Sequence, residues 1–467
     1  MTENTVAISI AINVGKWVIK TQREIEAKDI EEIAQEIGVE VGQEVLQNGI
    51  KEIDQQIAKR VPKGWHNVGT EERWMTSSVG ELRYKRRIYL DEQKQRRKPV
   101  DELLGLEEKG RMSRRVREMG SYLASEGTYR RAAGELSWLL KTPVSHSAVQ
   151  RMVWQTGKRI EAGEEAERQR IFENGEKVLG GTVVAPVLYG ESDGVWVHLQ
   201  REKRKSTEVR VAIMSSGRKR IGKDRFRLEK KCCLTAVGVN SEEWQEQILR
   251  TAHLKYDLSQ TKLLITGGDG NHWVRHSFDR LGVKQEFILD QFHLKRAAQR
   301  AFHNREKANR VVNILRTRGF EEARDSLQSC MEQAEGKHKE QLEDFYNYVR
   351  NNQDVLLDLE HRGCGSPAFL GAIEGNVDKL VVHRMKSHGC CWHIQGLQAM
   401  LALCRHKEEL SIHAYQYLPV SITKLPCHRT SKIEEDYSEV TEKSMPIFVG
   451  PDQGKLWVRQ LYHLTHD

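Results

Sequence analysis

The chain has 467 residues, of which 38% are hydrophobic and 30% are charged, and its formal net charge is +8 at pH 7. This length excludes a single ordinary domain, because domains of roughly 100 to 200 residues would number about three. The hydrophobic content suffices for packed cores, and the positive surplus points, though only weakly, to a polyanionic partner.

No stretch of the sequence reaches the roughly 18 consecutive apolar residues that a membrane span needs. The N-terminus also has no basic start ahead of an apolar run, so no secretion signal is predicted. The eight cysteines contain no C-x-x-C pair, which favours reduced thiols over a structural zinc site. We therefore expect a cytoplasmic protein without membrane association.

An N-terminal region, residues 1–62, is predicted to be helical. Isoleucine and valine recur between Ile30 and Ile57 at helical spacing, with acids and glutamines between them. The apolar face of one or two such helices either packs on its own domain or joins two copies of the chain, because periodicity does not separate these alternatives.

Residues 63–112 are predicted to form a basic β-hairpin and linker. Trp74–Thr76 and Leu82–Leu90 flank Val79-Gly80, and Arg83, Lys85 and Arg87 alternate with apolar residues on the second strand. This basic face, continued by the run from Lys94 to Lys98, is either a phosphate-binding surface or a solvated face.

Residues 113–160 have the pattern of a helix-turn-helix DNA-binding unit. Helices are predicted from Arg114 to Ala124, from Thr128 to Leu136, and after a turn at Lys141–Val144, with Ser145 as the N-cap of the third. The alternative is a three-helix packing module without DNA contact. In the DNA-binding interpretation, four polar residues of the third helix face a groove of the duplex: His146, Ser147, Gln150 and Arg151. A charged connector, residues 161–179, follows.

The remaining chain predicts an α/β fold whose mixed sheet is interrupted by an all-α insertion. Residues 180–293 form its first part, residues 294–370 the insertion, residues 371–406 the closing helices, and residues 407–467 a C-terminal region without an assigned role. Strands are expected at Val187–Gln200, Thr207–Met214, Lys231–Val239, Leu263–Ile265 and Gln285–Leu289, with helices at Ser241–Ala252 and Asn271–Leu281.

Three acids occupy positions suited to chemistry. Asp269 follows a short apolar strand, at the carboxyl end where open α/β sheets bind ligands. Asp193 interrupts another strand, and Glu374 opens a helical pattern. Each acid also has a simpler interpretation, as a turn residue or as a first-turn acid favoured by the helix dipole. Together they suit Mg²⁺, which prefers oxygen ligands and few protein carboxylates.

This part of the sequence resembles the catalytic domain of DDE transposases, specifically the ISLre-type bacterial insertion-sequence family related to Mutator-like transposases. The residues that carry the resemblance are Asp193 in ESDGVWV, Asp269 in TGGDGNHWV, Asp290 and His293 in ILDQFHLKR, and Glu374 in IEGNVDKL. The hairpin and helix-turn-helix patterns resemble the same family. The resemblance implies an RNase H-like fold for residues 180–406.

The implied activity is binding of the terminal inverted repeats of an insertion sequence, cleavage of its ends and joining of the 3′-hydroxyl to target DNA. Asp193, Asp269 and Glu374 would hold two Mg²⁺ or Mn²⁺ ions, with Asp290, His293 and Trp392 nearby. Expected partners are double-stranded DNA and further copies of the chain. Residues 201–231 contain 13 Lys or Arg and 4 Asp or Glu. Six basic residues are predicted to contact phosphates: Arg218, Lys219, Arg220, Lys223, Arg225 and, beyond this segment, Lys386.

Two other functions fit the same sequence. One is an RNase H-like nuclease or resolvase that cleaves without integration, and the other is a DNA-binding regulator derived from a transposase. Strand-transfer products distinguish the first alternative, and loss of all cleavage activity distinguishes the second.

Overall fold

The computed structural model describes residues 5–14, 17–26, 30–106, 110–175, 180–223, 225–358, 361–362 and 370–407. The predicted C-terminal region beyond Lys407 and a part of the predicted insertion lie outside these ranges. None of the helices in the described ranges is long and apolar enough to cross a lipid bilayer.

The first 26 residues contain a β-hairpin rather than the predicted helical region. Strand β1 (Thr5–Val14) pairs antiparallel with β2 (Trp17–Glu26). Val6, Ile8, Ile10 and Ile12 alternate with small or polar residues, and this period of two is the strand signal that the helical prediction overlooked. The helical prediction holds from Ile30 onward, where α1 (Ile30–Ala58) is one continuous helix.

The predicted second hairpin is present and packs against α1. Strands β3 (His66–Ser77) and β4 (Gly80–Leu90) pair antiparallel, β5 (Arg96–Arg97) adds to β4, and α2 (Pro99–Leu103) follows. Arg83 and Lys85 are exposed as expected, but Arg87 forms an ion pair with Asp54 of α1. One of the three basic residues predicted on this face is therefore paired within the protein, whereas Arg83 and Lys85 are exposed.

A buried carboxylate organises this hairpin. Asp101 of α2 accepts hydrogen bonds from Arg73 Nη1 at 2.5 Å, Arg86 Nε at 2.6 Å and Tyr84 Oη at 2.8 Å. Burial and the neighbouring Asp101 carboxylate raise the pKa of the Tyr84 hydroxyl, which keeps it protonated as a donor. Each buried charge is thereby paired, as burial in a low-dielectric interior requires.

The three predicted helices of residues 113–160 are α3 (Arg114–Glu126), α4 (Tyr129–Leu140) and α5 (His146–Phe172). Ser145 caps α5 as predicted, because its side chain accepts the backbone N–H of Ala148. α5 continues to Phe172, so the first part of the predicted connector, residues 161–179, is helical. Oppositely charged neighbours such as Glu165 and Arg168 pair along its surface and support the longer helix.

The centre of the chain is a five-stranded mixed sheet with strand order β10-β7-β6-β11-β12. Its strands are β6 (Val187–His198), β7 (Ser206–Ser215), β10 (Cys232–Val237), β11 (Leu263–Gly268) and β12 (Gln285–Leu289). Within this sheet, β7 pairs antiparallel with both β6 and β10, whereas β11 pairs parallel with both β6 and β12. A separate hairpin, β8 (Gly217–Arg220) and β9 (Phe226–Glu229), extends from the end of β7.

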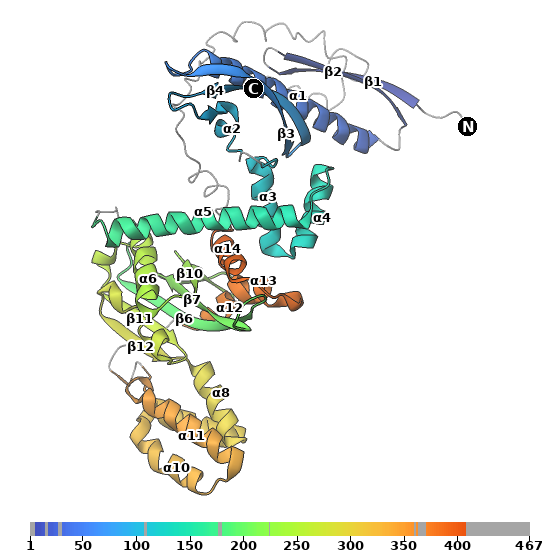
Figure 1. The fold of residues 1–467 in the computed structure, drawn as a ribbon. Helices are drawn as coiled ribbons and strands as arrows, with labels where there is room; N and C mark the ends of the chain where they lie inside the picture. Colours follow the sequence, from blue (N-terminus) through green and yellow to red (C-terminus); the bar gives the residue numbers. More distant parts are fainter. Residues whose placement is uncertain are drawn as a thin grey trace, which may run out of the picture. The chain divides into compact units, whose positions relative to one another are not determined.

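Helices cover the two faces of the sheet (Figure 1). One face packs on α6 (Ser241–Lys255) and the short α7 (His272–Arg275), around the buried Trp244, Leu188 and Phe278. The other face packs on α12 (Ile373–Val377), a π-helical turn (Asp378–Val382), α13 (His383–Met385) and α14 (Ile394–Arg405). The expected long helix over Asn271–Leu281 is thus only one turn, followed by a 3-10 turn at Asp279–Leu281.

The segment after β12 forms its own helical core. Helices α8 (Gln291–Phe302), α9 (Arg305–Arg318), α10 (Phe320–Glu332) and α11 (Gly336–Asn351) pack around Leu294, Leu315, Leu327 and Phe345. The predicted all-α insertion between the second and third acids is therefore present within the described residues.

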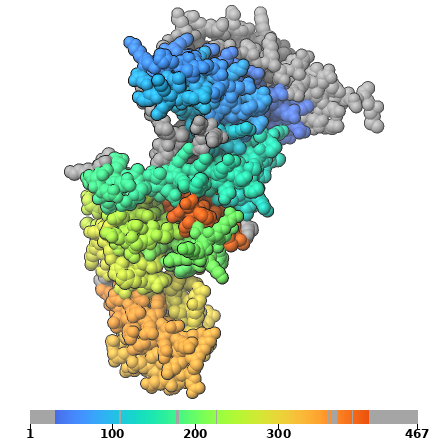
Figure 2. Space-filling model, in the orientation of Figure 1, coloured from blue at the N-terminus to red at the C-terminus, as the bar shows by residue number. Residues whose placement is uncertain are grey.

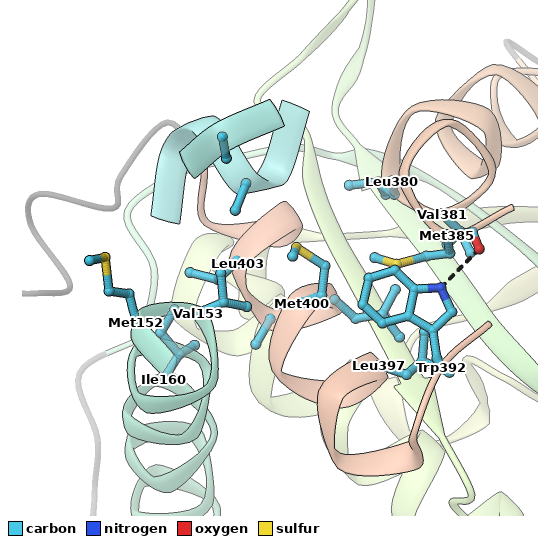
Figure 3. Close-up of a cluster of buried hydrophobic side chains, with 14 of the residues drawn as sticks. Met152, Val153, Ile160, Leu380, Val381, Met385, Trp392, Leu397, Met400 and Leu403 are labelled. Atoms are coloured by element: carbon cyan, nitrogen blue, oxygen red, sulfur yellow. Dashed lines mark hydrogen bonds between the residues drawn. The ribbon is translucent and has the colours of Figure 1, made fainter. Parts of the chain in front are cut away.

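Close packing of α5 on α14 joins the three-helix unit to the sheet. Met152 and Ile160 of α5 share one core with Leu397, Met400 and Leu403 of α14, and Trp392 closes it (Figure 3). At Gly157 the helices approach so closely that a methyl group would lie 2.5 Å from the backbone of Ala399.

A partly buried acid supplements this contact. Glu164 of α5 forms ion pairs with Arg405 at 2.7 Å and with Arg250 of α6 at 3.4 Å. Burial alone would raise the pKa of Glu164, but Arg405, His406 and Arg250 together lower it well below its ordinary value.

The first prediction concerns Gly157. Gly157→Ala should destabilise the protein by about 1–3 kcal/mol, because the added methyl overpacks the α5–α14 contact. Chemical denaturation checks this. Gly134→Ala is the matched control, since nothing lies within 4 Å of a methyl group there; it should stabilise by about 0.5–1 kcal/mol. A Gly157→Ala variant as stable as the wild type would contradict the tight contact.

The second prediction concerns Glu164. Glu164→Gln should cost about 2 kcal/mol at pH 7, because it removes the carboxylate that pairs with the buried Arg405 guanidinium. The pKa of Glu164 is lower in the folded protein, so its stabilising contribution is complete above the ordinary pKa of 4.5 and is lost as pH falls below it. The difference between variant and wild type in thermal denaturation should therefore shrink in acid. A difference that stays constant with pH would contradict the ion pairs.

Candidate functional site

Asp193 lies within β6, opposite Val211 of β7, and not in the hairpin turn that was the alternative. Side chains alternate along a strand, so Asp193 shares the face of Glu191 and Val197, the face that carries α12. Its carboxylate accepts the N–H of Gly194 at 2.7 Å.

Two further acids lie beside it. Asp269 follows β11, Asp290 follows β12, and these parallel strands end at the same edge of the sheet. Burial raises the pKa of Asp193, the Gly194 N–H and His293 lower it, and Asp269 and Asp290 raise it again. The structure therefore brings Asp193, Asp269, Asp290 and His293 within electrostatic range, with His293 Nε2 3.9 Å from the Asp290 carboxylate.

Asp269 and Asp290 are oriented by the turns that follow them. Asp269 accepts the backbone N–H of Asn271 at 2.9 Å and the Asn271 side-chain amide at 2.5 Å. Asp290 caps α8 by accepting the Phe292 N–H at 2.8 Å. Glycine is required before Asp269, because a methyl group at Gly268 would lie 2.2 Å from Val274.

Glu191 attaches α12 to the same strand. Its carboxylate, only 4% exposed, accepts the backbone N–H groups of Gly371 at 2.7 Å, Ala372 at 3.2 Å and Ile373 at 3.2 Å. These are the otherwise unpaired donors at the start of a helix. Glu374 directly follows Ile373. Its helix therefore begins beside Glu191, which is two residues before Asp193 on β6.

The side chain of Glu374 is exposed and does not join the other acids. Within the described part of the chain, no three His, Cys, Asp or Glu side chains are arranged to hold one metal ion. The helix of Glu374 thus lies on the same face of the sheet as Asp193, but the Glu374 carboxylate does not lie with those of Asp193 and Asp269.

Two residues near the acids were not predicted from the sequence. Burial raises the pKa of Glu208 on β7, Arg210 lowers it, and Asp269 and Asp193 raise it. Glu208 pairs with Trp196 and lies beside Gly194, on the face of the sheet opposite Asp193. Tyr348 of α11 donates its hydroxyl to the Asp269 carbonyl at 2.9 Å, so the insertion reaches the acids. Pairing β6 with β7 from their hydrophobic patterns would have placed Glu208 near Gly194; no local signal marks Tyr348.

The predicted DNA-contacting side chains are all exposed. They comprise His146, Ser147, Gln150, Arg151, Arg218, Lys219, Arg220, Lys223, Arg225 and Lys386. Arg384, two residues before Lys386, is buried and donates to the Ala124 carbonyl at 2.6 Å.

Trp392 is a core residue and not a site residue. Its ring is 5% exposed, and its Nε1–H donates to the Met385 carbonyl at 2.9 Å, the dashed line in Figure 3. The same ring packs against the Arg384 guanidinium, whose Cζ lies 4.8 Å from the ring centroid.

The third prediction concerns Glu191. Glu191→Ala should destabilise the protein by about 2 kcal/mol or more, because three N–H groups lose their acceptor. Amide hydrogen exchange should accelerate at residues 371–373. Glu191→Gln should restore most of the protection, since one amide oxygen can accept the two N–H groups now bound by a single carboxylate oxygen. Glu374→Gln is the exposed control and should change neither quantity; unchanged exchange in Glu191→Ala would contradict the anchor.

Comparison with known proteins places the chain in a family. A "UPF0236 protein in vanSb 3'region" of Streptococcus gallolyticus is 24% identical over 406 residues, which cover 85% of each chain. The model of UPF0236, an uncharacterised protein family, matches residues 20–411. This match covers most of the sequence, and the chain therefore belongs to the UPF0236 family.

Proposed function

We propose that this protein is a DDE-type DNA transposase with an RNase H-like catalytic domain. The observation that carries the proposal is the strand register that places Asp193 of β6 level with Asp269 and Asp290, which follow the neighbouring parallel strands, with the helix of Glu374 attached to β6. The mixed sheet, the helical insertion before Glu374 and the resemblance of the surrounding motifs support the same assignment.

The donor set suits hard divalent cations. Asp269 and Asp290 raise the pKa of the Asp193 carboxyl by repelling its negative charge, and a bound cation would relieve this repulsion. Two Mg²⁺ or Mn²⁺ ions there would activate the attacking oxygen and stabilise the leaving oxygen during phosphodiester cleavage. We assign Asp193, Asp269 and Glu374 as their ligands, which requires Glu374 to turn toward the other two. His293 is suited to orienting Asp290 or contacting the scissile phosphate.

Duplex DNA is the proposed partner of the three-helix unit. His146 and Ser147 are the first residues of α5, and with Gln150 and Arg151 they form an exposed polar face opposite the buried Val149 and Val153. In a helix-turn-helix unit this face would enter the major groove. Arg218, Lys219, Arg220, Lys223, Arg225 and Lys386 would add phosphate contacts, in an assembly of two or more copies on DNA in the cytoplasm.

The fourth prediction tests the acids. Asp193→Asn, Asp269→Asn and Glu374→Gln should each reduce Mg²⁺-dependent cleavage and joining of labelled element ends more than about 100-fold, because each removes a metal ligand. Binding of the same ends, measured in EDTA, should be retained. Glu322→Gln, an exposed carboxylate of α10, is the control and should cleave like the wild type.

The remaining outcomes distinguish the alternatives. Cleavage without joined products would identify a nuclease or resolvase, and specific binding without any cleavage would identify a DNA-binding regulator. Loss of activity in Asp290→Asn together with full activity in Glu374→Gln would overturn the assignment of Glu374. A protein that neither binds nor cleaves the ends would refute the transposase proposal.

A further inference from the structure

A second charged site lies beside β10, the outermost strand on one side of the sheet, and is separate from the acids near the ends of β11 and β12. It is a groove of about 1350 Å³ walled by the β8–β9 hairpin, the end of α6, α12 and the last turn of α14. Gly375, Asn376 and Lys379 line it, whereas Glu374 does not belong to its described lining. In Figure 2 the last helices, in red, reach the surface between α5, in teal, and the green residues of the sheet region.

The groove is strongly basic. Its described lining contains ten Lys or Arg and three Glu. Two of the three acids, Glu164 and Glu167, already pair with Arg250. Five of the cations have no acidic partner in the described part of the chain: Lys219, Arg227, Lys230, Lys255 and Lys379. Like charges in one concave surface repel one another, so this arrangement favours a polyanion.

Apolar side chains accompany the cations. Ile221 and Phe226 of the β8–β9 hairpin line the groove and are 60% and 49% exposed. The guanidinium carbon of Arg218 lies 4.3 Å from the centroid of the Phe226 ring. An exposed aromatic ring within a basic groove is the combination that binds nucleic acid strands with unpaired bases, which stack on the ring.

We propose that this groove binds single-stranded DNA, with Lys230 and Lys379 contacting phosphates and a base stacking on Phe226. Bases within a duplex are stacked on each other and present no face to Phe226, so a duplex would use only the cations. The volume also exceeds the roughly 300–1,000 Å³ of small-molecule pockets. The choice of DNA rests on the proposed function, whereas binding of a single-stranded polyanion does not.

The experiment measures fluorescence anisotropy of the full chain, in EDTA, with a labelled thymidine 12-mer and with a duplex of the same length. Phe226→Ala should weaken binding of the single strand about 5- to 100-fold, the effect of losing one stacked base, and leave duplex binding unchanged. Phe226→Tyr should restore the affinity. Phe292→Ala is the matched control, because that ring is 48% exposed and lies outside the groove lining.

The cations are tested by salt dependence. Lys230→Ala combined with Lys379→Ala should reduce the slope of log affinity against log salt for the single strand by about 1.4, two phosphate contacts at about 0.7 each. Thermal denaturation of every variant establishes that it is folded. An unchanged slope in folded protein, or equal losses for single strand and duplex in Phe226→Ala, would overturn the proposal.

Two further arms distinguish a strand-binding groove from a peptide-binding groove and from the cluster of acids. A synthetic peptide of residues 431–442, which is rich in Glu and Asp, should not displace the oligonucleotide. Tight binding of the peptide with no binding of DNA would identify a polypeptide ligand and refute the proposal.

Asp193→Asn should bind the single strand like the wild type. Strand binding without any cleavage activity would leave the groove standing while the transposase proposal fails.

Discussion

The packing of α5 against α14 is the contact on which the arrangement of the sheet and the three-helix unit depends. Gly157 permits a backbone-close approach to Ala399, and Glu164 pairs with Arg405 and Arg250 from two other helices. A continuous core therefore extends from α3–α5 through α14 to β6 and β7. Because α12 packs in that core too, the proposed DNA-reading helix and the helix of Glu374 are supported by the same buried side chains.

Acidic side chains lie on one side of α12 and basic side chains on the other. Acidic side chains lie around the strand that carries Asp193: Asp269 and Asp290 raise the pKa of the Asp193 carboxyl, and Asp269 and Asp193 raise that of Glu208. Across the helix, at the β10 edge, the groove collects lysines that have no acidic partner among the described residues. We propose that the cations of the groove hold a polyanionic strand and that the acids on the other side of α12 take part in its cleavage. Glu191 is central to this arrangement, because the carboxylate that anchors α12 comes from the strand of Asp193.

Local patterns accounted for much of the fold. The hairpin around Val79-Gly80, the three helices with the Ser145 cap and the five strands of the sheet all follow from periodicity and turn chemistry. Errors arose where two periods competed or where charge was taken as a sign of irregular structure. Residues 5–26 alternate as strands, and the charged residues after Ile160 continue a helix because their opposite charges pair along its surface.

By itself, the sequence determined the positions of Asp193, Asp269 and Asp290 at strands and of Glu374 at a helix start, since short-range patterns specify those elements. Only the tertiary structure decided which side chains meet. Glu208 lies beside Gly194, Tyr348 donates to the Asp269 carbonyl, Glu191 holds α12, and Arg384 is buried. The reason is physical: these contacts join residues far apart in the chain, and their partners are selected by strand pairing and packing, which no local period encodes.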